Sequence, residues 1–436
     1  MEGERVVIIG GGMVGVATAL MLKRNSPSSQ VLVLEKHPEV AQGTSFQNGG
    51  LIGYSYHKSW ARSKFLLGGL YSSFLDKQGF GSVSWKALTS FEFWEWSIRF
   101  MYACLFEDPK EKDDIIFKMS ERSTLLHKTL REEYSKKYLK ELKSYETVDN
   151  YLLDVAANKP ELQGQKQYCL YMNSRFNQLV RTYTTRQACI SFEPSLKHWK
   201  GEVLGCLLNK MDTLTGTNSL DLTKSLAEIA KKEGVVFLLG AEISNFKKHQ
   251  NSIVQAELTD GRIVEAEKWV ICAGVHSSAL GKQLGWKPPI WPVKGMSCNI
   301  LGLDLQRPIH YGGEFPLYFI PLKDGVRYSA FVEFTTLEDN QIEESKKTLM
   351  ESKAKSTTGV ENLEFKNYWT GFRPVSSDDM PIIGKFPQLD NVYINSGHGT
   401  RGSIMLFSSA ELLVQILLGQ VPILNPTPFD PSRFKF

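Results

Sequence analysis

Three glycines near the N-terminus have the spacing of a phosphate-binding turn. Gly10, Gly12 and Gly15 fill a G-x-G-x-x-G pattern directly after an apolar run over Val6–Ile9. Gly10 permits a tight turn, Gly12 lets a pyrophosphate approach the backbone, and Gly15 lets the next helix pack against the strand. Because the amino end of that helix faces the phosphate charge, the pattern predicts a site for a diphosphate.

An acidic residue completes the pattern. Glu35 follows the apolar run Gln30–Leu34 and lies 20 residues beyond Gly15. At that place a carboxylate can accept a hydrogen bond from a ribose hydroxyl. Strands on both sides of the glycines, with an acid in register, favour this interpretation over an incidental glycine-rich turn. The sequence therefore predicts that the chain binds a dinucleotide.

The elements that must position these residues begin with a β-α-β unit and a glycine-rich loop over residues 1 to about 55. Farther along, Asp260-Gly261 stands between the segments 252–259 and 262–266 and predicts a hairpin with a tight type I′ turn. We expect this hairpin to lead into an apolar strand over 268–273. The pattern is typical of a nucleotide-binding domain in three pieces, with a second domain in two insertions.

The remaining segments give a coarse outline of the second domain and of the C-terminal part. Hydrophobic periodicity and turn residues predict these elements. They are a mostly helical region from about 60 to 165, short strands and turns to about 215, a helix over 218–232, a strand over 235–239, β-structure over 290–335, a helix over 338–355, a strand over 392–394 and a helix from about 403 to 418.

Composition excludes several classes of protein. Lys and Arg number 51 against 47 Asp and Glu, and the resulting net charge of +4 is too small for this length to indicate a nucleic-acid partner. No two of the six cysteines form a C-x-x-C pair, so we expect free thiols and no metal site. The first strand begins within a few residues of Met1, and we expect no signal peptide. The cysteines are Cys104, Cys169, Cys189, Cys206, Cys272 and Cys298.

The aromatic segment Phe91–Phe106 carries apolar side chains on two faces of a predicted helix. It is too short and too charged to span a bilayer. A helix that is apolar on both faces is usually buried between other elements, and this is what we expect here. The alternative is docking on a membrane surface.

Five stretches, in order from end to end, match a known family. Through these matches the whole chain resembles the D-amino-acid oxidase superfamily of flavoproteins. Within it the chain is most similar to the D-amino-acid dehydrogenases, with glycine oxidase and sarcosine oxidase as more distant relatives. The stretches are VVIIGGGMVGVATALML from Val6, GTSFQNGGLIGYS from Gly43, WPVKGMS from Trp291, GFRPVSSDDMPIIG from Gly371 and NSGHGTRGS from Asn395.

The resemblance implies FAD as the cofactor and an α/β (α+β) fold. In this fold a Rossmann-type FAD-binding domain is interleaved with a substrate domain of antiparallel sheet plus helices. We expect the FAD-binding domain to comprise residues 1–85, 195–280 and 366–436, and the substrate-binding domain residues 86–194 and 281–365.

The resemblance also implies which residues hold FAD. Hydroxyls and bare N–H groups of the loop from Gly43 can meet the pyrophosphate and the flavin edge. The helix after the loop from Gly397 presents its positive end to the negative charge of a reduced flavin. The expected FAD-binding residues are Gly10, Gly12, Met13, Val14, Gly15, Glu35, Lys36, Gly43, Thr44, Ser45, Gln47, Asn48, Gly49, Gly50, Leu51, Ile243, Cys272, Ala273, Gly274, Gly371, Gly397, His398, Gly399, Arg401, Gly402 and Ser403.

Three residues match positions that contact the substrate in the family. Arg373 matches the arginine that pairs with the substrate carboxylate through two parallel hydrogen bonds. Tyr318 matches the tyrosine that donates to the same carboxylate, and Thr400 stands where a backbone carbonyl meets the substrate amine. We interpret His398 as a loop residue rather than a catalytic base. The implied reaction is hydride transfer from the substrate Cα to flavin N5, after which the imino acid hydrolyses to a 2-keto acid and ammonia.

One departure from the pattern bears on how FAD is held. Some relatives attach FAD covalently through a cysteine that aligns with Gly371, and none of the six cysteines of this chain lies there. We therefore expect non-covalent FAD.

Three functions stay open from the sequence. The first is a D-amino-acid dehydrogenase that passes electrons to a quinone or another acceptor. The second is an oxidase of glycine, sarcosine or proline-type amines that uses oxygen. The third is an FAD-binding assembly factor without turnover, which should lack the carboxylate-binding arginine, and Arg373 argues against it. We expect a cytoplasmic protein, or one that is peripheral on the inner face of a membrane.

Overall fold

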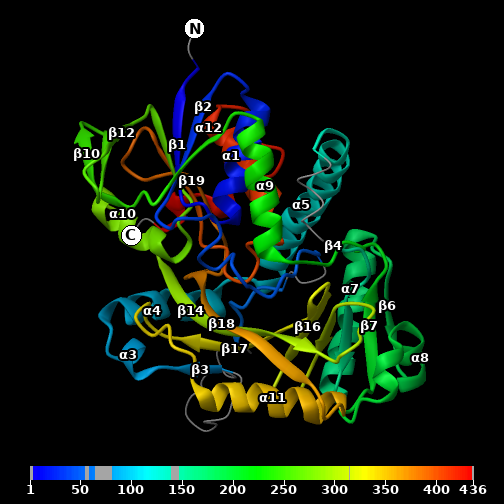
Figure 1. Cartoon of the computed structure of the whole chain (residues 1–436). Coiled ribbons are helices and arrows are strands. Elements are labelled where there is room, and N and C mark those ends of the chain that lie inside the picture. The colour runs from blue at the N-terminus through cyan, green and yellow to red at the C-terminus, as the bar shows by residue number, and fades with distance from the viewer. Residues whose placement is uncertain (1–2, 55–57, 64–80, 139–146, 314, 435–436) are drawn as a thin grey trace.

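The computed structural model describes residues 3–54, 58–63, 81–138, 147–313 and 315–434. Two main sheets organise the chain, as Figure 1 shows. One sheet and its helices occupy the upper half of the view, and the second sheet with helices around it occupies the lower half. The predicted α/β (α+β) class is confirmed. The exact domain boundaries stay a prediction.

The upper sheet has six strands in the order β19-β20-β13-β1-β2-β9. Its neighbouring strands pair in parallel, except that β19 and β20 are antiparallel. This is the twisted, mostly parallel sheet that the opening β-α-β unit predicts. Its strands are β1 (Arg5–Ile9), β2 (Gln30–Glu35), β9 (Val236–Leu239), β13 (Lys268–Ile271), β19 (Ile382–Lys385) and β20 (Val392–Ser396).

Three helices pack together against one face of this sheet. They are α1 (Met13–Asn25), α9 (Ser219–Lys232) and α12 (Leu406–Leu417), and their apolar faces share one buried core with β1 and β2. The last turn of α1 carries Lys23 and Arg24, whose positive charges stabilise the negative end of the helix dipole. Helix α12 begins three residues later than we expected, because residues 402–405 form turns before it.

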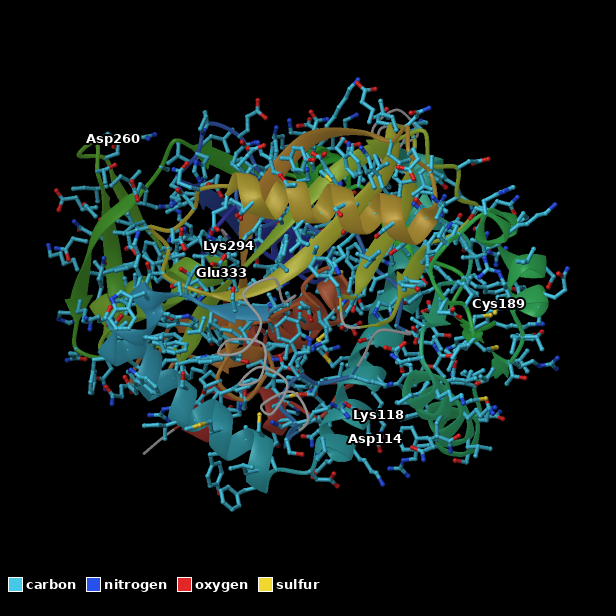
Figure 2. All side chains as sticks on the ribbon, turned by 90° about the horizontal axis from the view of Figure 1, so that it is seen from below. Asp114, Lys118, Cys189, Asp260, Lys294 and Glu333 are labelled. Atoms are coloured by element: carbon cyan, nitrogen blue, oxygen red, sulfur yellow. The ribbon has the colours of Figure 1, made fainter. Side chains whose placement is uncertain are left out.

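The predicted hairpin is confirmed. Strand β11 (Ser252–Leu258) pairs with β10 (Ile243–His249) and with β12 (Ile263–Glu265) in a small antiparallel sheet. The predicted type I′ turn is wrong, because such a turn needs positive φ at both Asp260 and Gly261 and only Gly261, with φ of +85°, has it. The N–H of Gly261 donates to the carbonyl of Leu258 at 3.0 Å, so the connection is a three-residue loop that ends in a left-handed glycine. Figure 2 shows Asp260 of the turn at the edge of the molecule, far from the second sheet.

The lower sheet has nine strands, in the order β18-β14-β17-β16-β15-β5-β7-β6 with β3 beside β17. Its pairs are antiparallel except β15 with β5 and β17 with β3. Its strands are β3 (Gly81–Val83), β5 (Leu153–Ala156), β6 (Val180–Tyr183), β7 (Gly205–Asn209), β14 (Ile290–Leu301), β15 (Ile309–Tyr311), β16 (Leu317–Leu322), β17 (Gly325–Phe334) and β18 (Glu364–Ser376), and a separate pair is formed by β4 (Thr147–Val148) and β8 (Gly216–Thr217).

Helices surround this sheet at the bottom and sides of Figure 1. The region from 60 to 165 is largely helical as predicted, although it also holds the short strands β3, β4 and β5. Among the described helices, none is both long and apolar enough to cross a membrane. The helices beside this sheet are α3 (Trp85–Leu88), α4 (Phe91–Phe106), α7 (Lys159–Phe176), α8 (Arg186–Phe192) and α11 (Glu344–Thr358). Helix α5 (Pro109–Lys137) packs on α12, and α10 (Ser277–Leu284) contacts β10. The 3-10 turns are η1 (Pro194–Lys197), η2 (Gly274–His276), η3 (Thr427–Phe429) and η4 (Pro431–Phe434).

Helix α11 corrects one prediction, because it begins at Glu344 rather than near Glu338. Asp339 accepts a hydrogen bond from Thr335 at 2.7 Å and pairs with the buried Lys294 at 3.2 Å. These contacts hold the segment before α11 in a turn. Lys294 also pairs with Glu333 at 2.9 Å, and Figure 2 shows the two beside each other next to α11.

Helix α4 corrects a second prediction, because only one of its two apolar faces is buried. Phe93, Trp96 and Phe100 pack on the strands β14 and β18, and the Trp96 indole donates to the carbonyl of Val375 at 3.0 Å. The opposite face is exposed, since no described element covers it. The exposed apolar side chains of α3 and α4 are Trp85, Phe91, Trp94, Ile98, Met101, Tyr102, Leu105 and Phe106.

Candidate functional site

A cavity of about 680 Å³ lies between the carboxyl ends of the upper-sheet strands and one face of the lower sheet. This is where open α/β sheets generally bind their ligands. Of the residues predicted to form the site, all but four line the cavity. The exceptions are Gly15, Gln47, Gly397 and Arg401.

The glycine-rich turn after β1 explains the spacing of its glycines. Gly10 has φ of +115°, and a Cβ there would lie 2.6 Å from the carbonyl oxygen of Cys272. A Cβ on Gly15 would lie 1.9 Å from the carbonyl oxygen of Gly10, so Gly15 serves the close packing of α1 on β1. Gly12 lines the cavity, and a Cβ built on it would meet, within 4 Å in the described protein, only the Ser45 hydroxyl, at 3.4 Å. The backbone at Gly12 is thus open to a phosphate at the start of α1.

Glu35 ends β2 at the edge of the cavity and is mostly buried. Its Oε2 accepts from the backbone N–H of Gly11 at 2.7 Å, and its Oε1 accepts from the N–H of His37 at 2.9 Å. A carboxylate oxygen can accept more than one hydrogen bond, so each oxygen keeps capacity for a hydroxyl. The side chain is therefore fixed in place, with room to bind a ribose.

The loop from Gly43 closes over the glycine-rich turn. The hydroxyl of Ser45 accepts from the N–H of Met13 at 3.0 Å, and Thr44 donates to the carbonyl of Phe372 at 2.6 Å. Gln47 points away from the cavity and donates to the carbonyl of Asn367 at 2.5 Å. The loop is thereby tied both to α1 and to β18.

Several buried polar atoms at the cavity have no partner within the described protein. They are the Nε2 of His398, the hydroxyls of Thr400 and Ser329, and the Oδ1 of Asn395. Buried polar groups are normally hydrogen-bonded, so such a group at a cavity indicates a polar ligand. Burial, helped by the nearby Arg401, lowers the pKa of His398 to about 3, so its ring is neutral at ordinary pH. These groups and the bare glycine backbone suit a ligand that has both hydrogen-bond donors and acceptors. The isoalloxazine ring of FAD is such a ligand.

The side chain of Arg401 lies behind the cavity wall rather than at it. It is fully buried and pairs with Asp379 at 2.8 Å, and it also donates to the carbonyl of Asp379. Gly397 adopts φ of +74° in the turn after β20. Both residues shape the loop that presents His398 and Thr400, instead of touching the cavity themselves.

Arg373 and Tyr318 come from different strands of the lower sheet and both line the cavity. Arg373, on β18, donates through Nη1 to the carbonyls of Lys294 at 3.3 Å and Phe331 at 3.2 Å. Phe331 has φ of +67° beside an irregularity in the pairing of β14 with β17, which turns its carbonyl toward the guanidinium. An oriented cation and a phenol that line the same cavity can together bind a carboxylate.

Cys272 is the one cysteine that lines the cavity among the described residues. Burial raises the pKa of its thiol to about 12, so the reactive thiolate is scarce. All six cysteines are free, as predicted. Cys169 is half-buried and the other five are buried.

Sequence reasoning missed several cavity residues. His276 of η2 lies 3.2 Å from the Nζ of Lys36, and burial together with that cation lowers the pKa of His276 to about 4. Trp60, Asn340 and Trp369 also line the cavity. The signal for His276 was its position two residues after Gly274, whereas Trp60 and Asn340 belong to segments that only the fold brings to the site.

Comparisons with known proteins agree along the whole chain. The family model described as "FAD dependent oxidoreductase" (DAO) matches residues 5–416. A D-amino acid dehydrogenase from Methylobacterium nodulans is 26% identical over 99% of both chains, and one from Xanthobacter autotrophicus is 25% identical over 99% of both.

Solved structures show the same fold at lower identity. Glycine oxidase from Geobacillus kaustophilus has a TM-score of 0.75 at 18% identity and covers 99% of this chain and 100% of its own. L-proline dehydrogenase from P. horikoshii has a TM-score of 0.74 at 18% identity and covers 99% and 98%.

Proposed function

The chain belongs to the FAD-dependent oxidoreductase (DAO) family, and we propose that it oxidises D-amino acids to 2-keto acids and ammonia. FAD is the cofactor of this family. The D-amino acid preference is supported by the two relatives named D-amino acid dehydrogenase, which match the chain over nearly its full length. We further propose that FAD is held without a covalent bond and that the domain division expected from the sequence describes the chain.

The observation that carries the proposal is that Arg373 of β18 and Tyr318 of β16 line the same cavity. A guanidinium binds a carboxylate through parallel charge-assisted hydrogen bonds, and a phenol can add another. The two carbonyls that bond Nη1 of Arg373 fix the plane of its guanidinium. A substrate carboxylate bound there has a defined orientation, which places its Cα–H in a repeatable position.

The residues of the chain divide between the cofactor and the substrate. Bound FAD supplies the acceptor for a hydride from the substrate Cα. Glu35 and the Gly12 backbone would hold its ribose and diphosphate, while the 397–403 loop would face its ring. Thr400 would accept from the substrate amine through its backbone carbonyl. With the carboxylate and amine both held, the protein contributes orientation and electrostatics, and needs no general base if the amine binds neutral.

We propose a quinone within a membrane as the electron acceptor. The exposed apolar face of α3 and α4 supports this, because it holds eight of the 17 large apolar side chains that are exposed among the described residues. Trp and Tyr on such a face suit the boundary between lipid headgroups and chains. The buried face of α4 packs on β14 and on β18, the strand that carries Arg373, so a docked membrane would lie on the side of the protein where β18 meets the cavity.

An anaerobic reduction assay tests the proposal. The purified FAD-loaded protein is mixed with D-amino acids, their L-enantiomers, glycine, sarcosine and proline, and flavin absorbance is followed. Bleaching by D-amino acids is the expected result. Arg373→Ala should raise the KM by roughly 100-fold, because it removes the charged partner of the carboxylate. Arg262→Ala, in the remote hairpin turn, is the matched control and should leave KM unchanged.

A second candidate is an oxidase acting on glycine, sarcosine or proline-type amines. The structural similarity to glycine oxidase and to L-proline dehydrogenase favours including glycine, sarcosine and proline among the tested substrates. Bleaching by secondary amines and rapid reoxidation by oxygen would replace the leading proposal with this one. No bleaching by any amine, with FAD bound, would instead indicate a non-catalytic FAD-binding assembly factor.

A further inference from the structure

Tyr318 stands in a row of side chains that crosses the lower sheet. The strand register places Ser329 of β17 opposite Tyr318 on one side and His310 of β15 opposite it on the other. Beyond His310, the next place in the row belongs to Asp154 of β5. Because residues directly opposite each other on neighbouring strands point to the same face, all four share the face that borders the cavity. Ser329 and Tyr318 line the cavity, whereas His310 and Asp154, farther along the row, do not.

Close contacts link the three residues of this row that carry rings or charge. The rings of His310 and Tyr318 stack with their centroids 4.4 Å apart and their planes 23° apart. The Nδ1 of His310 lies 2.7 Å from the Oδ1 of Asp154. A carboxylate bonded to one ring nitrogen fixes the orientation of an imidazole. The orientation of His310 in turn sets the surface on which the phenol ring of Tyr318 rests.

Asp154 carries the charge that this arrangement needs. Burial alone would raise the pKa of Asp154, but the charge of His310 and the hydrogen bond from it outweigh burial and lower the pKa. Lys58 adds in the same direction, and its Nζ lies 4.4 Å from the ring centroid of Tyr168. Gln165 donates to the backbone carbonyl of Asp154 at 2.9 Å, which anchors the strand. The carboxylate is therefore a fixed acceptor for His310.

A purely structural role is a poor account of this pair. The side chains of His310 and Asp154 are partly buried, with 22% and 31% exposed, so neither is a fully buried core residue. Ion pairs with this much exposure contribute little to stability. Within the pair, His310 stacks on Tyr318, whose phenol belongs to a residue of the cavity lining.

We infer that His310 and Asp154 form a positioning pair that holds the Tyr318 ring where its phenol meets the substrate carboxylate. The inference rests on the proposed function, since it assigns the residues that orient one substrate-binding group of that site. Binding groups need to be held within about 0.5 Å of their working position by the residues behind them. The stacked His310 ring restricts rotation of the phenol ring, and Asp154 restricts rotation of His310.

A double-mutant cycle tests the inference with benzoate, a simple carboxylate, as the probe. The FAD-loaded protein is titrated with benzoate, and the change in flavin absorbance gives Kd. Tyr318→Phe should weaken benzoate by roughly 10-fold, the expected effect of losing one hydrogen bond to a charged group. His310→Ala should weaken it by several-fold. If His310 acts only through Tyr318, the double variant should match Tyr318→Phe alone.

Two further variants separate positioning from folding. His310→Phe keeps a ring for stacking and should retain more affinity than His310→Ala, while Asp154→Asn should resemble a mild His310→Ala. With a turned-over substrate, the same variants should raise KM and leave kcat nearly unchanged. His249→Ala, on the exposed hairpin strand β10, is the matched control and should change neither.

The outcomes are decisive in both directions. The inference would be overturned if the double variant lost as much benzoate binding energy as the two single variants together. An unchanged benzoate Kd in His310→Ala would overturn it as well. Benzoate titration needs no turnover, so a protein that no amino acid reduces would refute the proposed function while the cycle still decides the role of His310. If Tyr318→Phe itself leaves both Kd and KM unchanged, the positioning role falls with the carboxylate role of Tyr318.

Discussion

The guanidinium of Arg373 lies over the bare Cα of Gly295 on the neighbouring strand. A Cβ built on Gly295 would come within 2.3 Å of Nη1 and 2.7 Å of Cζ of Arg373. No real side chain tolerates such a distance, so the position of the cation depends on the absence of a side chain at 295. The carboxylate-binding arginine and the glycine of the WPVKGMS stretch are thus one structural unit.

This relationship predicts that Gly295→Ala impairs carboxylate binding without removing a charge. The added methyl group must push Arg373 away from the carbonyls of Lys294 and Phe331. We expect benzoate Kd and substrate KM to rise by roughly 10-fold or more, since a displaced charged hydrogen bond costs about 1.5–3 kcal/mol. Gly164→Ala on α7, where a Cβ meets nothing within 4 Å, is the control. An unchanged Kd in Gly295→Ala would show that the cation can bind from another position.

Glu35→Gln should weaken FAD binding and also loosen the apoprotein. The amide keeps one acceptor oxygen but turns an NH₂ group toward one of the two N–H donors of Gly11 and His37. We expect FAD affinity to fall by roughly 10- to 100-fold, and the free energy of unfolding of the apoprotein to fall by about 1–3 kcal/mol. Titration of apoprotein with FAD and thermal unfolding measure the two effects. Glu39→Gln, on the surface, should change neither.

The sequence predicted the cofactor half of the fold better than the substrate half, and the reason is physical. The glycines at 10, 12 and 15 act through contacts within one β-α-β unit, so their spacing alone carries the geometry. Arg373 was recognisable from its motif, but the φ of +67° at Phe331 that aims a carbonyl at it depends on a mismatch between two strands distant in sequence.

Two other features that the sequence did not predict also depend on contacts between segments distant in the chain. The outer face of α4 was expected to be covered, yet periodicity reports only which residues share a face and not whether a second layer exists. Likewise, the row from Tyr318 to Asp154 joins strands β16, β15 and β5, and no local pattern predicts that β5 pairs with β15. Long-range strand pairing sets these features, so they come from the structure.

Acid should destabilise the protein in part through His127. This side chain is buried beside Phe407, with ring centroids 5.3 Å apart, and burial lowers its pKa to about 3. Because the native pKa lies below the unfolded value of about 6.5, the unfolded state takes up the proton first as pH falls. The stability present above pH 6.5 is therefore lost progressively between about pH 6.5 and pH 3.

His127→Leu should make the free energy of unfolding depend less steeply on pH in this acid range. Circular dichroism across a pH series, combined with urea unfolding, gives the free energy of unfolding at each pH. We expect the variant to lose less stability than the parent between pH 6.5 and pH 4, even if it is less stable at pH 7. His249→Leu, exposed on β10, should leave the slope as in the parent. An identical slope in His127→Leu would contradict the assignment.

All of the flavin should leave the protein on denaturation. Cys272 is the described cysteine at the cavity, and its raised pKa leaves it mostly as the thiol, which is a poor nucleophile. Acid precipitation followed by absorbance of pellet and supernatant measures the split. We expect the flavin in the supernatant and a protein mass equal to that of the 436-residue chain alone. Flavin retained in the pellet would contradict non-covalent binding.

The two faces of α4 should respond in opposite ways to substitution. The exposed set Trp94→Ser, Ile98→Ser and Leu105→Ser should change the melting temperature far less than a core substitution, because these side chains are exposed. The substitution of Trp94 removes the hydrogen bond from its indole to the carbonyl of Leu88 at 2.8 Å. The same triple variant should lose flotation with phospholipid vesicles, since binding of such a helix scales with the apolar area it inserts. Vesicle flotation and quinone-dependent reoxidation of the reduced enzyme measure the effect.

Trp96→Ala, on the buried face, is the opposite case. It removes a large core side chain and its hydrogen bond to Val375, so it should cost about 3–5 kcal/mol of unfolding free energy. The folded fraction should still float with vesicles, because the exposed side chains are intact. A triple variant that floats like the parent would refute membrane docking. Reoxidation of the reduced enzyme by a quinone at the same rate without vesicles would point to a soluble acceptor. The triple variant is expected to lose both flotation and reoxidation by quinone, while the substrate still reduces its flavin anaerobically. This result would show that α4 acts in electron transfer to the quinone, after the substrate has been oxidised.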